Sequence, residues 1–147
     1  MNVRCVSYVP DHSAGKCGYN DLLIGIEHGV VGCGSKTFNA SNPGDYVMIT
    51  AKKNKNKKNE IRYVVIGVLC EKLDLCDKWQ IEGGDTWAYN WSYKPVTNMF
   101  IYDDSTKAEV KKIAEENSLK FKNLFNPMYC SNKLILLIEM LIKKFSL

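Results

Sequence analysis

The chain has 147 residues, of which 46% are hydrophobic, and its 20 basic and 16 acidic side chains give a formal net charge of +4. This length and apolar content suit a single domain spanning residues 1–147 and leave little room for a second one. The small positive charge favours an anionic partner without requiring one. No apolar run reaches the roughly 20 residues that a membrane-spanning helix needs, so we expect no membrane span.

Residues 1–6 lack the long apolar segment of a secretory signal, so we expect a cytoplasmic protein, or a nuclear one in a eukaryote. The thiols of its 6 cysteines would then stay reduced. His12, Cys17, His28 and Cys33 repeat one spacing and could surround a zinc ion, but that spacing matches no common zinc motif. We therefore predict neither a metal nor a cofactor.

The N-terminal part predicts a strand, a helix and a loop. Residues 3–9 are rich in β-branched and aromatic side chains, which favours a strand. Asn20 and Asp21 predict the start of a short helix over residues 22–26, which ends at Gly25 or Gly29. The segment 29–36 is dense in glycine, which lets the backbone approach a ligand closely, and we interpret it as a binding loop.

The rest of the chain predicts several more strands and two closing helices. The turn formed by residues 42–45 leads into β-rich runs at 46–50 and 61–69, which predict a hairpin with a long, lysine-rich and asparagine-rich tip. Residues 98–102 favour another short strand. Ser105 predicts the cap of a helix that continues to residue 117, and a second helix is expected from about 132 to 145. We expect an α+β fold, namely a small mixed or antiparallel β-barrel with peripheral helices.

Aromatic residues concentrate between positions 79 and 93, and all 3 tryptophans lie there. In an extended chain the alternating residues Trp87, Tyr89, Trp91 and Tyr93 point to one side. One interpretation is a strand whose inner face fills the core. The other is a wall of rings, with Trp79 nearby, on which nucleic-acid bases stack.

Polar and basic residues near the aromatic segment favour the second interpretation. The side chains that could hydrogen-bond the edge of a base are Asp85, Asn90, Ser92 and Ser35. Lys36 and Lys94 could contact phosphates. The lysines of the hairpin tip either contact phosphates too or form a solvated loop, and they are Lys52, Lys53, Lys55, Lys57 and Lys58.

Four segments, taken in order, resemble the EVE domain family. They are the "GIEHGVVGCGSK" stretch of residues 25–36, the "NPGDYVMI" stretch of 42–49, the strand of 63–69 and the "WSYKPV" stretch of 91–96, followed by a similar closing helix up to residue 142. The glycine-rich loop lacks the family's histidine. The resemblance implies a PUA-like barrel, related to YTH and ASCH domains, whose pocket receives a flipped base. It also implies that Val31 and Cys33 join Ser35 and the four alternating aromatic residues in contacting that base.

The leading hypothesis is a non-enzymatic reader of DNA or RNA that carries a modified base, such as methylated cytosine or adenine. Any nuclease or ATPase activity would come from a separate subunit. One alternative is a small amidohydrolase of the ASCH kind acting on a modified nucleoside, with Lys36, Thr37 and Glu71 as its reactive residues. The other is a module that binds a peptide or a methylated lysine by cation–π attraction.

Overall fold

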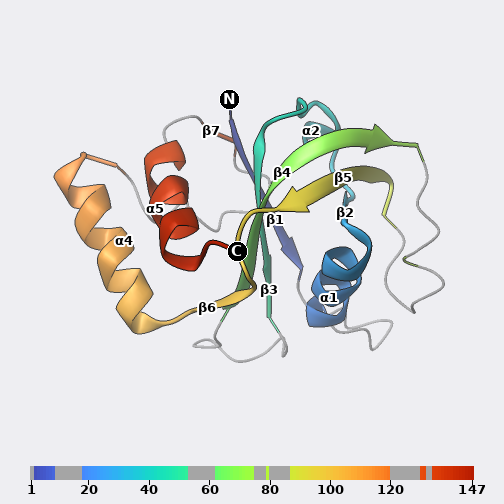
Figure 1. The fold of residues 1–147 in the computed structure, drawn as a ribbon. Coiled ribbons are helices and arrows are strands. Elements are labelled where there is room, and N and C mark those ends of the chain that lie inside the picture. The colour runs from blue at the N-terminus through green and yellow to red at the C-terminus, as the bar shows by residue number, and fades with distance from the viewer. Residues whose placement is uncertain are drawn as a thin grey trace.

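The computed structural model describes residues 2–8, 18–52, 62–74, 79, 87–119, 130–131 and 134–147, and the structural statements below concern these residues. Figure 1 shows one sheet with helices on both of its sides. The fold is therefore α+β, as predicted.

The N-terminal part contains strand β1 (Val3–Tyr8), helix α1 (Gly18–His28) and strand β2 (Val30–Cys33). Helix α1 is longer than the predicted range of residues 22–26. Gly25, one of its two predicted ends, lies inside it and packs on β2, where a Cβ would come 2.5 Å from the carbonyl oxygen of Val30. The helix ends at Gly29, which adopts a φ of +65° that favours glycine. The predicted binding loop was wrong at its start, since residues 30–33 form a strand.

The middle of the chain contains the short helix α2 (Lys36–Asn39) and the strands β3 (Tyr46–Ala51) and β4 (Arg62–Leu73). The predicted turn precedes β3, and Gly44 takes a φ of +90° there. Strands β3 and β4 pair in an antiparallel register from Tyr46↔Val68 to Ala51↔Tyr63, which confirms the predicted pairing of these two runs. Strand β4 continues beyond the predicted residue 69, as far as Leu73.

The C-terminal part contains strands β5 (Tyr89–Pro95) and β6 (Phe100–Tyr102), helix α4 (Asp104–Glu116), strand β7 (Cys130–Ser131) and helix α5 (Ile135–Phe145). The predicted cap of α4, Ser105, lies two residues after the observed one. Asp103 caps the helix, because its carboxylate accepts a hydrogen bond from the Thr106 backbone N–H at 2.8 Å.

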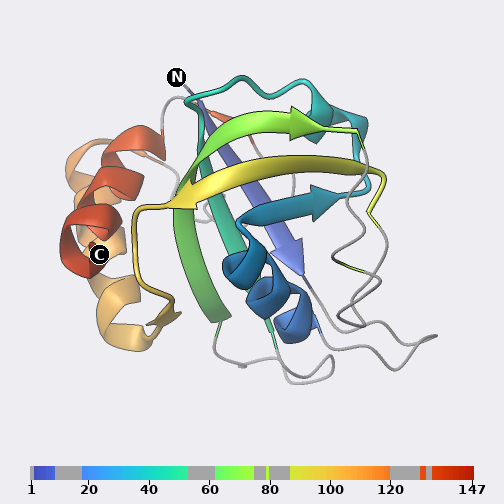
Figure 2. The same ribbon diagram turned by 45° about the vertical axis from the view of Figure 1, so that its right-hand side comes forward.

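The seven strands form a single sheet in the order β2-β5-β4-β3-β1-β7, with β6 pairing to β4. The pairing is antiparallel except between β1 and β3. Figure 2 shows that the sheet curls, so that β5 and β2 arch over α1. The sheet is thus a half-barrel, which matches the coarse prediction of a small barrel-like fold.

Each face of the sheet carries its own core, because successive residues of a strand point to opposite sides. On the outer face, Val64 and Ile66 of β4 pack against Leu137 and Leu141 of α5, which confirms that the closing helices cover the sheet. The inner face points toward α1 and α2 and carries a second cluster, whose buried members are Val6, Tyr8, Leu22, Val31, Cys33, Phe38, Val47, Ile49, Ala51, Val65, Leu69, Trp91 and Tyr93. Within the described ranges, no helix is both long enough and apolar enough to span a membrane.

Candidate functional site

Strands β2 and β5 bring together the two groups of residues predicted to contact a base. They pair antiparallel, with Val31 opposite Trp91 and Cys33 opposite Tyr89. Residues directly opposite each other in such a pair share one face of the sheet. The glycine-rich segment and the aromatic segment, far apart in sequence, thus lie side by side on the inner face.

The aromatic side chains of β5 point inward but are not equally accessible. Tyr89, Trp91 and Tyr93 all belong to the inner-face cluster, which confirms their shared side. Trp91 is 2% exposed and Tyr93 is 5% exposed, whereas Tyr89 is only partly buried. Trp91 and Tyr93 therefore fill the interior, and Tyr89 lies nearer to solvent.

Trp87 does not continue the alternation of β5, because the strand begins at Tyr89. Its side chain lies over Gly32, where a Cβ would come 2.5 Å from Trp87 Cβ. Gly32 is opposite Asn90, so this contact lies on the face that Asn90 occupies, not on that of Trp91. Trp87 nevertheless packs against the inner-face cluster that contains Tyr89, Trp91 and Tyr93, and its ring contacts that of Tyr8, so it touches residues on both sides of β2.

Asn90 and Trp79 form a hydrogen-bonded unit behind β5. Trp79 Nε1 donates to Asn90 Oδ1 at 2.9 Å, and Asn90 Nδ2 donates to the Trp87 carbonyl at 2.9 Å. Trp79 is 1% exposed and Asn90 is 1% exposed. The Asn90 amide thus positions the two tryptophans, a structural role that the sequence did not indicate.

Tyr8 joins the end of β1 to the free edge of β2, and sequence reasoning missed it. Its hydroxyl donates to the Gly32 carbonyl at 2.8 Å and accepts from the Gly32 N–H at 3.0 Å. Its ring contacts those of Trp87 and Trp79, with centroids 5.2 and 6.4 Å away. Burial raises the pKa of the Tyr8 phenol well above its ordinary value. No local pattern could identify this residue, because its partner lies 24 residues away in sequence.

Three ring donors near β5 have no hydrogen-bond partner among the described residues: Trp87 Nε1, Trp91 Nε1 and Tyr93 Oη. Burial also raises the pKa of Tyr93, so its phenol keeps its proton and remains a donor. Most buried polar groups in proteins are hydrogen-bonded. Several buried ring donors in this part of the sheet are therefore left without a hydrogen-bond partner among the described residues.

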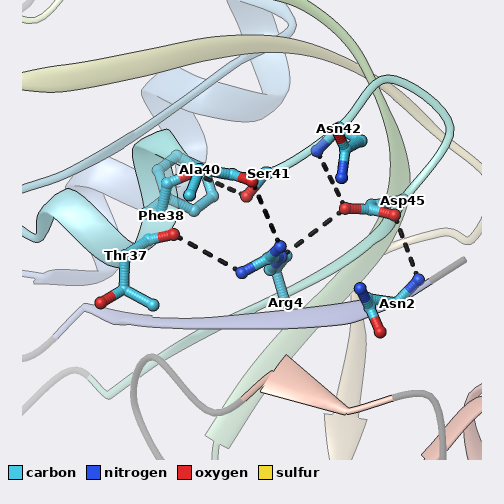
Figure 3. Close-up of polar contacts among 8 residues, drawn as sticks. All are labelled: Asn2, Arg4, Thr37, Phe38, Ala40, Ser41, Asn42 and Asp45. Carbon is cyan, nitrogen blue, oxygen red and sulfur yellow. Dashed lines mark hydrogen bonds and ion pairs between the residues drawn. The ribbon is translucent and has the colours of Figure 1, made fainter.

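The segment after β2 is fixed by caps and by Arg4 of β1 (Figure 3). Ser35 Oγ accepts from the Thr37 N–H at 3.2 Å, so its predicted base-contacting hydroxyl serves as the cap of α2.

The Arg4 guanidinium donates to the carbonyl groups of Thr37 and Ala40, and its Nε lies 3.6 Å from Asp45 Oδ2. The Asp45 carboxylate also accepts hydrogen bonds from the backbone N–H groups of Asn2 and Asn42. These bonds hold α2 and the turn before β3 against β1.

The predicted phosphate contacts are spread over the molecule. Lys36 is exposed at the start of α2, a helix that lies against β5. Lys52 follows β3, and Lys94 is exposed on β5 with its side chain on the opposite face from Trp91 and Tyr93. Asp85 and the other lysines of the hairpin tip lie outside the described residues, namely Lys53, Lys55, Lys57 and Lys58.

The four residues with repeated histidine and cysteine spacing are only partly placed. His12 and Cys17 lie outside the described residues, while His28 ends α1 and Cys33 ends β2. Burial raises the pKa of the Cys33 thiol, which disfavours the thiolate that a metal would need. In the described part of the chain, no three side chains of the metal-binding types gather.

Comparison with known proteins gives no assignment: no protein-family model matches the chain, and neither does any curated protein. The function must therefore be argued from the site itself.

Proposed function

We propose that this protein binds DNA or RNA and holds a single base, extracted from its stack, against the inner face of β2 and β5, without catalysing a reaction. The observation that carries this proposal is the set of unpartnered ring donors at β5, of which Trp91 and Tyr93 are almost fully buried.

Unused buried donors are unfavourable for an isolated protein. A buried donor without a partner costs about 1–3 kcal/mol, so such groups persist where function needs them. A nucleobase carries carbonyl oxygens and ring nitrogens that accept hydrogen bonds. Both atoms are covered in the structure, so an entering base must open the inner-face cluster before the Trp91 indole and the Tyr93 phenol gain their missing partners.

The partly exposed rings supply the stacking surface. Tyr89 and Trp87 lie at the start of β5, and neither is fully buried. Stacking on an aromatic ring contributes roughly 1–3 kcal/mol per base, and extracting a base costs a few kcal/mol. Two rings and two hydrogen bonds are together of the size needed to offset that cost.

The resemblance to the EVE family supports the same function and adds detail to it. A PUA-like barrel of that kind would hold a modified base, such as methylated cytosine or adenine, and Val31 and Cys33 already lie beside the aromatic strand. A nuclease or ATPase on a separate polypeptide would then act on the nucleic acid that this domain selects.

The two alternative functions find less support. Lys36 and Thr37 lie at α2 and Glu71 lies on β4, and no hydrogen bond or ion pair joins the three within the described ranges. For a methyl-lysine site, one face of the Trp91 ring is already covered by the protein's own Lys72, whose Nζ lies 5.7 Å from the ring centroid.

The test is a titration of fluorescent single- and double-stranded oligonucleotides, unmodified and methylated, with the wild type and Tyr93→Phe. Removing the phenol oxygen deletes one hydrogen bond, so we expect binding about 2- to 10-fold weaker for the preferred oligonucleotide.

Tyr102→Phe is the matched control, because Tyr102 lies on β6 against the outer core. It should bind as the wild type does. Failure of the wild type to bind any oligonucleotide at low salt would overturn the proposed function, and equal affinities of wild type and Tyr93→Phe would move the site away from β5.

A further inference from the structure

A β-bulge in β4 changes which charged side chain this strand places beside the aromatic residues of β5. Leu69 is opposite Tyr93, but the next pair is Glu71 with Ser92, so Cys70 is an extra residue in β4. An extra residue moves every following side chain of the strand to the other face. Lys72 is consequently opposite Trp91.

The bulge replaces a negative side chain by a positive one at this position. In an unbroken register Glu71 would be opposite Trp91 and Lys72 opposite Asn90. With the bulge, Glu71 lies on the outer side with Ser92, whose hydroxyl accepts from the Glu71 N–H at 3.1 Å and donates to the Glu71 carbonyl at 3.3 Å. These bonds hold the strand in the shifted register.

Lys72 is held at the site but keeps its charge available. Its Nζ lies 5.7 Å from the centroid of the Trp91 ring, a contact that restrains the side chain by cation–π attraction. The residue is exposed, and no ion pair to it occurs among the described residues. A bound anion would therefore not have to displace a carboxylate.

We propose that Lys72 contacts the phosphate next to the base held at β5, and that the bulge at Cys70 exists to place it there. This inference rests on the proposed function and assigns the backbone contact of the same site. It also distinguishes Lys72 from Lys94, which lies on the other face of β5.

The experiment measures the affinity of the preferred oligonucleotide for Lys72→Gln, Lys72→Arg, Lys94→Gln and Lys111→Gln as a function of salt. Losing one charged contact should weaken binding by Lys72→Gln about tenfold. It should also make the log–log salt slope about 0.7 smaller for a single strand, or 0.9 for a duplex. Lys72→Arg keeps the charge and should keep most of the affinity.

Lys111→Gln is the control for a general loss of charge, because Lys111 is exposed on α4 on the other side of the sheet. It should stay within about twofold of the wild type. If Lys72→Gln is no weaker than Lys111→Gln, or if Lys94→Gln is weaker than Lys72→Gln, this inference fails while the proposed function stands. If the wild type binds no oligonucleotide, both fail together.

Discussion

The phenol groups of Tyr8 and Tyr93 belong to the same inner-face cluster but differ in their hydrogen bonding. Tyr8 Oη bonds both backbone groups of Gly32, whereas Tyr93 Oη has no partner in the described part of the protein. A buried hydroxyl stabilises the fold when it is bonded and destabilises it when it is not. The same substitution should therefore have opposite effects at the two positions.

We predict that Tyr8→Phe lowers the free energy of unfolding by about 1–3 kcal/mol, because it leaves the Gly32 N–H and carbonyl without a partner. Tyr93→Phe should raise it by about 1 kcal/mol, because it removes an unsatisfied polar atom and keeps the ring. Urea unfolding followed by tryptophan fluorescence measures both. A loss of stability in Tyr93→Phe would mean that its hydroxyl has a bonding partner in the folded protein.

At the level of single residues, the sequence indicated which residue types the site contains but not what each one does. Val31 and Cys33 lie opposite Trp91 and Tyr89, the aromatic residues with which the family resemblance grouped them. Asn90 and Ser35 were predicted to contact a base, but they bond to the protein itself. Such roles depend on contacts between distant segments, which local sequence does not encode.

Among the elements, β1 and the turn before β3 are joined by an ion pair between Arg4 and Asp45 that is largely shielded from solvent. Arg4 is 9% exposed and Asp45 is 3% exposed. Another pair, Lys144 with Glu109, joins α5 to α4 at 2.8 Å, but both of its side chains are well exposed. The two pairs should contribute very differently to stability, because solvent screens the second.

We predict that Asp45→Ala destabilises the protein by about 3–5 kcal/mol, since it leaves the Arg4 charge buried without its partner and frees two backbone N–H groups. Glu109→Ala is the control and should change stability by less than about 1 kcal/mol. Thermal unfolding of the two variants provides the comparison. Equal effects would show that the network around Arg4 does not hold α2 in place.

The strands β1, β3, β4 and β6 were predictable from residue type and turn residues, whereas β2 was predicted as a loop, and two further features of the elements were not predictable. For α1, the sequence left the end of the helix open between Gly25 and Gly29, and glycine at position 25 is instead needed for close contact with Val30. The bulge at Cys70 has no marker such as glycine or proline, so the side on which Lys72 lies could not be derived from the sequence. Both depend on packing between elements.

For the whole molecule, the two-sided sheet explains why the fold class could be predicted while the closure of the half-barrel could not. The nearly continuous apolar runs of β3 and β4 indicate that both faces are covered. How far the sheet curls is set by the long-range pairing of β2 with β5 and by the Tyr8 contact with Gly32. Burial of tyrosines inside this curled sheet has a consequence for stability at high pH.

Stability should decrease steeply above pH 10. Burial raises the pKa values of Tyr8, Tyr93 and Tyr102, the last to about 12, because it disfavours the phenolate. In the unfolded chain these phenols lose their protons near pH 10, so above that pH the folded state binds more protons than the unfolded state. The stabilisation is complete below pH 10 and is lost as the pH rises toward 12 and beyond, by up to about 1.4 kcal/mol per pH unit for each phenol.

Urea unfolding at several values between pH 8 and pH 11.5 measures this slope, and tyrosinate absorbance reports the ionisation directly. Tyr93→Phe removes one titrating phenol and should reduce the slope of unfolding free energy against pH by about 1.4 kcal/mol per pH unit. This difference distinguishes the contribution of the tyrosines from that of lysines that titrate in the same range. The same variant tests the site, because it should be more stable at neutral pH and yet bind the oligonucleotide more weakly. A profile that stays flat to pH 11.5, or that is unchanged in Tyr93→Phe, would mean that solvent reaches the inner face of β5 in the folded protein.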